Sequence, residues 1–310
     1  MTMKYYTALL LSLIFVCSSC FEQDYTLCTD EPEPEERNNL VVLLDLKDGD
    51  GGSLFAEKIT SVDVFLYNSD MKLIDHRRGE PGGLGSMSRF EYTVFPGTYY
   101  AVCWANVDTH SAIRGASTNS YFWEPYVETV SQATGSPLYY APEREVTDRP
   151  ENPGMWGVEM GLHQAIVNKG FVTEKEMLLR RVHRNIKMYL RGYRDYIEVA
   201  NPSVQLTTMP CQYDFYIRTY LQRKAYQAGA SDAQTSGGVM PMAAFDIPIA
   251  SVNESSTLNV IRQSDVQAVA SFSLKSFMDD NAAKIRDMNE ISILITFASD
   301  GSASIGYPGW

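Results

Sequence analysis

Residues 90–105 read FEYTVFPGTYYAVCWA, and this stretch decides the fold class. Aromatic and β-branched residues are frequent from Phe90 to Phe95, and a similar pattern returns from Thr98 to Ala105. That composition is typical of β-strands. Pro96-Gly97 lies between the two runs, and this dipeptide marks a turn. The stretch therefore predicts a β-hairpin.

Strand patterns continue on both sides of this hairpin. Leu40–Leu46 is a short apolar run, and Ile59–Tyr67 alternates with Asp63 on the face opposite its valines. A turn at residues 68–70 predicts a second hairpin. Residues 107–157 are rich in Gly, Pro, Ser, Asn and aromatic residues and predict a long excursion at one end of the sheet, with Leu138–Tyr140 as a short strand.

The same pattern restarts in the second half of the chain. Alternate residues from Val182 to Leu190 predict a strand with one inward face. Ser273–Met288 is the one long stretch that suggests a helix. Further runs of strand type are Tyr213–Leu221, Ala243–Ile249, Leu258–Ile261, Ile291–Phe297 and Ser304–Tyr307.

Two successive sets of short strands predict an all-β protein of two tandem β-sandwich domains. We place the N-terminal β-sandwich at residues 40–172 and the C-terminal β-sandwich at residues 173–310, because Asn168-Lys169-Gly170 interrupts the pattern. A single large sandwich is the less favoured alternative at this length.

The composition excludes several classes of function. The chain has 310 residues and a formal net charge of −12, which disfavours nucleic acid as a partner because phosphate binding requires clustered Lys and Arg. Five cysteines without repeated zinc spacing and four scattered histidines predict no metal site. We also find no nucleophile elbow, phosphate loop or dinucleotide fingerprint, and we predict no catalytic residues and no cofactor.

The N-terminus has the features of an exported lipoprotein. Lys4 precedes an apolar run from Ala8 to Val16, which is too short to span a bilayer and predicts a signal peptide over residues 1–19. Small residues directly before Cys20 resemble a bacterial lipobox, so Cys20 is the predicted lipid attachment residue. Cys17 is a weaker candidate, and an ordinary cleaved signal before Cys20 remains the alternative.

Residues 20–39 predict an acidic tether between this lipid and the folded body. Seven carboxylates and two prolines lie between Phe21 and Glu36, with Arg37 as the only cation. Such a segment has little apolar surface to bury and is expected to stay extended. Of the remaining cysteines, Cys28, Cys103 and Cys211, we expect Cys103 to be a buried thiol.

The order of these features resembles the FimB-like family of fimbrial anchor and minor subunits from Bacteroidetes, the Mfa-type anchors included. Three segments carry the resemblance: residues 59–70, with a strand and an Asp-containing turn; residues 95–106, FPGTYYAVCWAN; and residues 179–187, LRRVHRNIK. The resemblance implies transthyretin-like (Greek-key) topology in both domains. It also implies a lipid-anchored, surface-exposed protein of the cell outer membrane, with fimbrial shaft or pilin subunits as partners.

Filaments of such families grow by strand exchange, in which a strand of one subunit completes the sheet of its neighbour. Ile291–Phe297 and the tail to Trp310 are one candidate donor, although the pattern favours an ordinary core strand. Cleavage after Arg37 would release the body from Cys20, so we expect no processing there.

A second class of function stays open, namely a glycan-binding or host-ligand-binding surface lipoprotein. Exposed aromatic residues can stack on sugars, and Tyr121-Phe122-Trp123, Tyr126 and Tyr139-Tyr140 are the candidates. We favour packing of these rings onto the sandwich, because aromatic side chains gain much from burial. Asp48-Gly49-Asp50-Gly51-Gly52 hints at a calcium loop, but its ligand spacing is incomplete, and a glycine-rich turn is the favoured interpretation.

Overall fold

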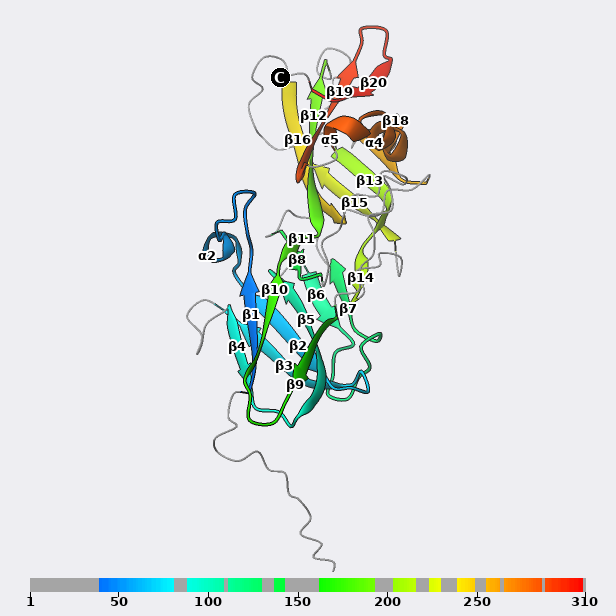
Figure 1. The fold of residues 1–310 in the computed structure, drawn as a ribbon. Coiled ribbons are helices and arrows are strands. Elements are labelled where there is room, and N and C mark those ends of the chain that lie inside the picture. Colours follow the sequence, from blue (N-terminus) through cyan, green and yellow to red (C-terminus); the bar gives the residue numbers. More distant parts are fainter. Residues whose placement is uncertain are drawn as a thin grey trace, which may run out of the picture.

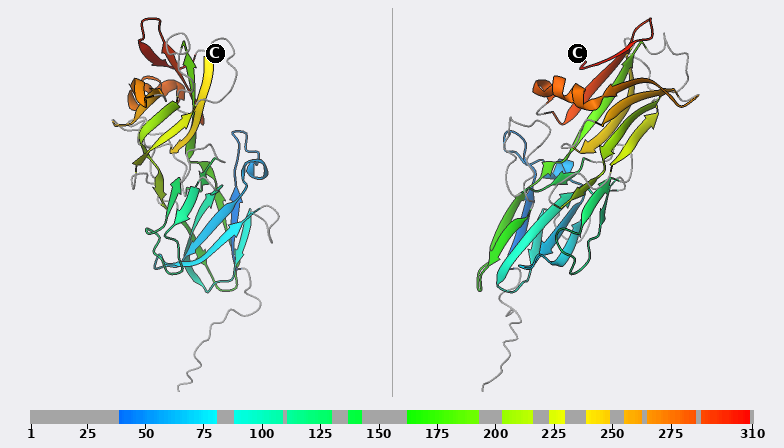
Figure 2. Two further views of the ribbon diagram at one scale, coloured as in Figure 1. Left: turned by 180° about the vertical axis from the view of Figure 1, so that it is seen from behind. Right: turned by 90° about the vertical axis from the view of Figure 1, so that its right-hand side faces the viewer.

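The computed structural model of the chain describes residues 39–80, 88–108, 111–129, 137–142, 162–192, 203–215, 223–229, 239–248, 255–262, 265–285 and 288–308. Within these residues the protein consists mainly of strands, which confirms the predicted all-β class. Figure 1 shows two lobes that follow one another along a long axis, and Figure 2 shows the same arrangement from two further sides. Transthyretin-like topology stays a prediction.

The first lobe contains three sheets. Their orders are β10-β1-β4, β11-β8-β5-β2-β3 with β9 also paired to β5, and β14-β7-β6. The strands are β1 (Leu40–Asp45), β2 (Val62–Tyr67), β3 (Leu73–Gly79), β4 (Arg89–Tyr92), β5 (Gly97–Ala105), β6 (Ser111–Arg114), β7 (Tyr126–Thr129), β8 (Tyr139–Tyr140), β9 (His163–Val167), β10 (Thr173–Leu178), β11 (Arg180–Arg181) and β14 (Gln212–Asp214), with a short helix α2 (Phe55–Lys58).

Strand β2 of the central sheet in this lobe is buried on both faces. Every residue of β2 is buried, with Val62, Val64 and Leu66 in one apolar core and Phe65 and Tyr67 in the other. Strands β6 and β7 belong to the third sheet, whose residues contribute to the second core. The expected excursion at one end of the sheet is therefore wrong in part, because its described residues 111–129 pack on a face of the sheet. The aromatic and apolar residues of this segment are stabilised more by burial on the sheet than by exposure to solvent at its end.

The predicted hairpin at residues 90–105 is also wrong, although both of its strands are present. β4 pairs with β1 in one sheet, while β5 pairs with β2 in the other. Pro96-Gly97 turns the chain from one sheet to the next. The side chain of Asn39 accepts a hydrogen bond from Val94 N and donates one to Val94 O, which fixes the end of β4 beside the start of β1.

The change from first-lobe to second-lobe pairing falls later than residue 172. β10 pairs in parallel with β1, and β11 pairs with β8, so residues 173–181 complete sheets of the first lobe. The predicted boundary between residues 172 and 173 would cut through this pairing. Residues 168–170 form the turn between β9 and β10 and do not separate the lobes. The sequence does not distinguish the two cases, because a turn within a lobe and a linker between lobes have similar composition.

The second lobe has two four-stranded sheets with the orders β16-β12-β19-β20 and β15-β13-β17-β18. One apolar cluster includes buried residues from both sheets and from the helices. The elements are β12 (His183–Arg191), β13 (Ser203–Pro210), β15 (Arg223–Gly229), β16 (Val239–Pro248), β17 (Thr257–Arg262), β18 (Gln267–Ser273), α4 (Leu274–Asp280), α5 (Ala282–Ile285), β19 (Glu290–Phe297) and β20 (Ala303–Gly306).

Two predictions for this lobe can be compared directly. The helix expected at Ser273–Met288 forms as α4 and α5, separated at Asn281, and the Ser273 hydroxyl caps α4 by accepting from Ser276 N. β19 lies between β12 and β20 and is a core strand of its own sheet, as the sequence pattern favoured. Among the described residues, no helix has the length and apolar character needed to cross a membrane.

Candidate functional site

The predicted lipid attachment residue, Cys20, lies outside the described residues, as do Cys28, Arg37, His110 and Trp310. The lipid anchor, the tether and the absence of cleavage at Arg37 therefore stay predictions. Cys103 and Cys211 are buried thiols. Burial raises the pKa of the Cys103 thiol well above its ordinary value, so this thiol is held in its unreactive protonated form.

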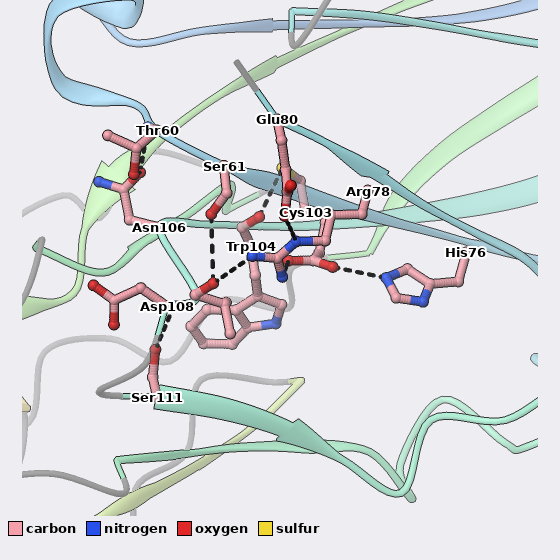
Figure 3. A network of polar contacts seen from close by, with 12 residues as sticks. Thr60, Ser61, His76, Arg78, Glu80, Cys103, Trp104, Asn106, Asp108 and Ser111 are labelled. Atoms are coloured by element: carbon pink, nitrogen blue, oxygen red, sulfur yellow. Dashed lines mark hydrogen bonds and ion pairs between the residues drawn. The ribbon is translucent and has the colours of Figure 1, made fainter. Parts of the chain in front are cut away.

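An ion pair between a buried carboxylate and a partly exposed guanidinium joins the two strands of the hairpin β2–β3. Asp63 is buried in β2, and Arg78 lies directly opposite it in β3. Arg78 donates to Asp63 Oδ2 at 3.0 Å, and His76 Nε2 lies 2.9 Å from Asp63 Oδ1 (Figure 3). Arg78 also donates to the carbonyl of Val107 at 2.8 Å. A buried carboxylate needs such partners, so this cluster has a structural role.

A second polar clamp centres on Asn106, at the end of β5. Its side-chain oxygen accepts from Thr60 N at 2.8 Å, and its side-chain nitrogen donates to the carbonyls of Lys58 and Pro137 at 2.9 and 3.1 Å. Asn106 is buried and has φ 61, a left-handed conformation that Asn tolerates better than most residues. One side chain thereby ties together three chain segments, which explains why Asn follows Trp104-Ala105.

An aromatic cluster ties the first lobe to a strand from the second half of the sequence. Trp104 is fully buried, and its ring centroid lies 4.6 Å from that of Tyr140 and 5.9 Å from that of Tyr213. The Tyr140 hydroxyl donates to the Phe215 carbonyl at 2.8 Å, and the Tyr213 hydroxyl donates to the Val182 carbonyl at 2.9 Å. β14 also pairs with β7. The chain therefore returns to the first lobe after forming β12 and β13.

The described histidines do not form a metal site with other ligands. No group of three or more His, Cys, Asp and Glu residues suited to a metal ion occurs in the part of the chain that the structure describes. His163 Nε2 lies 3.0 Å from the Ala141 carbonyl, and burial lowers the pKa of His163 to about 4. Burial also lowers the pKa of His183 to about 3, so both rings are neutral at pH 7.

The Asp48–Gly52 segment is a tight turn. Asp48 Oδ1 accepts from Asp50 N and Gly52 N at 3.0 and 2.7 Å, and Asp48 N donates to the Gly52 carbonyl at 2.9 Å. These local bonds use the carboxylate to fix the backbone. Gly51 has φ 86, which favours glycine.

The aromatic residues proposed as ligand contacts differ in exposure. Phe122, Tyr139 and Tyr140 are buried, as packing predicts, and Tyr126 is partly buried. Tyr121 and Trp123 are 36% and 54% exposed and stack on each other, with ring centroids 4.6 Å apart and an interplanar angle of 9°. The Lys72 ammonium lies 5.4 Å from the centroid of the Tyr121 ring. An exposed, stacked pair of rings is a surface on which a flat apolar face could stack.

Strand β18 is the least protected long sheet edge. Edge strands usually carry charged residues or Pro, which oppose pairing with another chain. Among the described edge strands of at least six residues, β3, β10, β15 and β16 follow this rule, whereas β18 reads QAVASFS and contains neither charge nor Pro. Val266, directly before β18, is 75% exposed. β18 therefore lacks the charged residues and Pro found on the other long edges, although its pairing with β17 contains one register irregularity.

Several of these features were not predicted from the sequence. Asp63 was assigned to the face opposite the valines, but nothing indicated that this face is also buried or that Arg78 lies opposite. The residues of β18 alternate weakly, so the sequence does not predict its edge position. The Trp104-Ala105-Asn106 motif is visible in the sequence, but its clamp depends on Lys58 and Pro137, which lie far away in the sequence.

Solved structures with the same fold come from Bacteroides and Porphyromonas species. A protein from Bacteroides ovatus that is proposed to be an adhesin has a TM-score of 0.67 at 12% identity, covering 88% of this chain and 94% of that chain. A Bacteroides thetaiotaomicron protein proposed to bind polysaccharide has a TM-score of 0.65 at 10% identity, covering 87% and 96%. The fimbrial anchor protein Mfa2 from Porphyromonas gingivalis has a TM-score of 0.62 at 13% identity, covering 87% and 97%.

These identities are low, so the three structures establish the fold alone. Among proteins with curated functional descriptions, none matches this sequence significantly. The family model for the fimbrillin-A associated anchor proteins Mfa1 and Mfa2 matches residues 33–310, which include every described residue. The chain therefore belongs to the family of fimbrillin-A associated anchor proteins Mfa1 and Mfa2.

Proposed function

We propose that this protein is a surface lipoprotein that anchors a fimbria or serves as one of its minor subunits, with lipid on Cys20 holding it in the outer membrane. The match of the anchor family to residues 33–310 carries the proposal. The signal-like run and the small residues before Cys20 support the lipid anchor. Multiple acyl chains would hold the protein stably in a bilayer. The proposed role is structural and requires no catalysis.

The first test compares cells by negative-stain electron microscopy. Cells that lack the gene and cells that carry Cys20→Ala should lose their filaments, or produce filaments that are longer or shed into the medium. Cys17→Ala is the matched control, because it changes the neighbouring cysteine and should leave the filaments attached. Unchanged filaments in both the deletion strain and the Cys20→Ala strain would exclude the anchor role.

Residues 20–38 should remain attached to the mature protein. Cleavage after Arg37 would separate Cys20 from the body, which would defeat a lipid anchor. We therefore expect protein extracted from the outer membrane to have no accessible N-terminus at Asn38. N-terminal sequencing that begins at Asn38 would show that the protein is processed like a polymerising pilin.

We further propose that pilin joins this protein by β-strand exchange at the β18 edge. β18 is uncharged and ends the sheet β15-β13-β17-β18, so its outer backbone groups could pair with an extended strand of a partner. The C-terminal donor considered from the sequence is not retained as Ile291–Phe297, because β19 is a central strand.

A charge placed on this edge tests the proposal. Ala268 is exposed, so Ala268→Lys should change the free energy of unfolding by no more than about 0.5 kcal/mol. The Lys side chain should nevertheless prevent pairing, so the filament should no longer co-purify with the variant. Ala268→Ser is the control, since it keeps the edge uncharged. Normal co-purification of Ala268→Lys with filaments would rule out β18 as the site of exchange.

The stacked pair Tyr121 and Trp123 supports a second candidate function, the binding of a glycan. A pyranose ring could stack on the exposed indole, as in many sugar sites that use aromatic faces. Trp123→Ala should then remove any retardation of the protein in affinity gels that contain surface polysaccharide, while Phe95→Ala, at another exposed ring, should not. Equal migration of wild type and Trp123→Ala in every gel would exclude glycan binding through Trp123, and the anchor role would be the one remaining candidate function.

A further inference from the structure

One end of the first lobe exposes a group of large apolar side chains. Phe95, Ile166, Phe171 and Val172 are 50%, 57%, 71% and 62% exposed. We call these four residues the apolar tip. Single exposed apolar residues are ordinary on protein surfaces, whereas several at one place indicate contact with something apolar.

Strand directions place the four residues at the same end of the lobe. β4 is antiparallel to β1, β5 follows β4, β9 is antiparallel to β5, and β10 is parallel to β1. The β4–β5 turn, the β9–β10 turn and the start of β1 therefore meet at one end, and the chain leaves for the second lobe at the other. Figure 1 shows the β9–β10 connection at the end of the first lobe away from the second lobe.

Hydrogen bonds connect these turns to one another. Asn39 bonds through its side chain to the backbone of Val94 and through its carbonyl to Thr173 N. The Thr173 hydroxyl donates to the Ile166 carbonyl at 3.0 Å, and the Tyr99 hydroxyl donates to the Phe95 carbonyl at 2.8 Å. The exposed apolar residues thus lie on turns that hydrogen bonds hold together around Asn39, the first described residue.

The charges at the apolar tip differ from those of the whole chain. The two turns, residues 95–97 and 168–172, contain Lys169 and no carboxylate, although the chain has 38 Asp and Glu residues and a net charge of −12. The turns themselves therefore present exposed Phe and Val beside a single cation, which suits contact with a bilayer surface. The carboxylates that flank the start of β1 and the β9–β10 turn in the sequence, Glu36 of the tether and Glu174 of β10, lie outside these two turns.

From this arrangement we propose that the apolar tip rests in the lipid headgroup region of the outer membrane and fixes the orientation of the anchored protein. The inference builds on the proposed lipid anchor, because residues 20–38 run from Cys20 to the start of β1. These 19 residues span at most roughly 65 Å, so the apolar tip can reach the bilayer that holds the lipid. The second lobe and the β18 edge would then point away from the membrane.

A fluorescent reporter beside the apolar tip tests the inference in the acylated, full-length mature protein. In a Cys28→Ser background, an environment-sensitive dye is attached to Lys169→Cys, next to Phe171 and Val172. Ser302→Cys, in the β19–β20 turn of the second lobe, is the matched control. The protein is reconstituted in vesicles of phosphatidylethanolamine and phosphatidylglycerol that contain doxyl-labelled lipid, and quenching is measured.

We expect the dye at position 169 to shift to shorter wavelength and to be quenched several-fold more than the dye at 302. Adding Phe171→Ser and Val172→Ser should return its quenching to the level at 302. Flotation of the vesicles measures anchoring separately. Flotation that depends on Cys20 together with equal quenching at both positions would overturn the inference while leaving the anchor intact, whereas loss of flotation would remove the anchor itself.

Two further results would also overturn it. A dye that already reports an apolar environment in the non-acylated Cys20→Ser protein, at monomer mass, would mean that the protein's own tether covers the apolar tip. The same signal at twice the monomer mass would assign the apolar tip to a contact between two copies of the chain.

Discussion

At the scale of single residues, buried polar side chains hold this β protein together where its strands end. Asn106 and the Asp63–Arg78 pair each join segments that lie apart in the sequence. Buried polar groups of this kind add little net stability when satisfied, but removing one partner leaves the others without hydrogen bonds. Their substitution should therefore be more damaging than the loss of the same number of surface bonds.

Asn106→Ala should lower the free energy of unfolding by roughly 3 kcal/mol, because Thr60 N and the carbonyls of Lys58 and Pro137 lose a buried side-chain partner. Asn119→Ala is the matched control, since Asn119 also has a positive φ, 69°, but an exposed side chain. Urea denaturation of both variants measures the difference. Equal destabilisation would mean that backbone strain, and not the clamp, accounts for the effect.

The buried histidines predict a loss of stability in acid. Burial lowers the pKa of His163 to about 4 and that of His183 to about 3, whereas both titrate near 6.5 in the unfolded chain. Since the unfolded state binds more protons, their contribution is fully present above pH 6.5 and is lost as the pH falls toward 4 and 3. The loss approaches about 1.4 kcal/mol per pH unit for each histidine.

His183→Phe isolates one of these contributions, because it keeps an aromatic ring near Tyr213 and removes the titrating group. Urea midpoints between pH 7 and pH 4 should fall less steeply for this variant than for the wild type. The two proteins should be compared relative to their own stability at pH 7, where both histidines are neutral. Parallel curves would show that His183 is not the source of the acid sensitivity.

At the scale of secondary structure, each strand's role depends on its partners more than on its own residues. β4 and β5 have the pattern of a hairpin but belong to different sheets. β19 and β18 are both seven or eight residues long, yet one is central and the other is an open edge. These assignments separate strands required for folding from strands available to a partner.

Truncation distinguishes the two C-terminal strands. A chain that ends at residue 300 loses the short edge strand β20 and the partly buried Tyr307, and its second lobe should stay folded because the fully buried core remains. A chain that ends at residue 289 also loses β19 and with it Ile291, Ile293 and Ile295 of the core, so this lobe should unfold. Amide exchange of β12, which pairs with β19, measures the outcome. Full protection of β12 in the shorter chain would show that β19 is dispensable.

At the scale of the whole molecule, the two lobes share chain segments. β10 and β11 pair with first-lobe strands directly before the chain enters the second lobe. β14 pairs with β7 of the first lobe although it follows β12 and β13 in the sequence. Separating the lobes would therefore remove strands and aromatic residues from the first one. For a protein proposed to connect a filament to a membrane, this sharing resists separation of the lobes under tension.

Tyr213→Ala should destabilise the first lobe, although Tyr213 belongs to the second half of the sequence. The ring packs against Trp104, so its loss should reduce the free energy of unfolding by about 3 kcal/mol and increase amide exchange in β5 and β8. Tyr213→Phe keeps the ring and loses only the bond to Val182, with an expected effect near 1 kcal/mol. Unchanged exchange in β5 after Tyr213→Ala would contradict the proposed coupling.

The sequence by itself determined the all-β class, the family and most strand positions, because period-2 alternation and turn residues act over a few neighbouring positions. It also predicted that β19 is a core strand, since exposing an unbroken apolar stripe to water is unfavourable in free energy. It predicted the lipid anchor as well, which rests on local residues alone and stays a prediction.

Only the tertiary structure decided which strands pair, that β2 is buried on both faces, and where the apolar tip lies. Phe65 and Tyr67 show the reason. Their burial depends on a third sheet that includes β14, almost 150 residues further along the chain, and no local pattern carries that information. Phe95 and Phe171 likewise lie at the same end of the lobe only because the β4–β5 and β9–β10 connections are both there. Their shared position follows from strand direction and pairing.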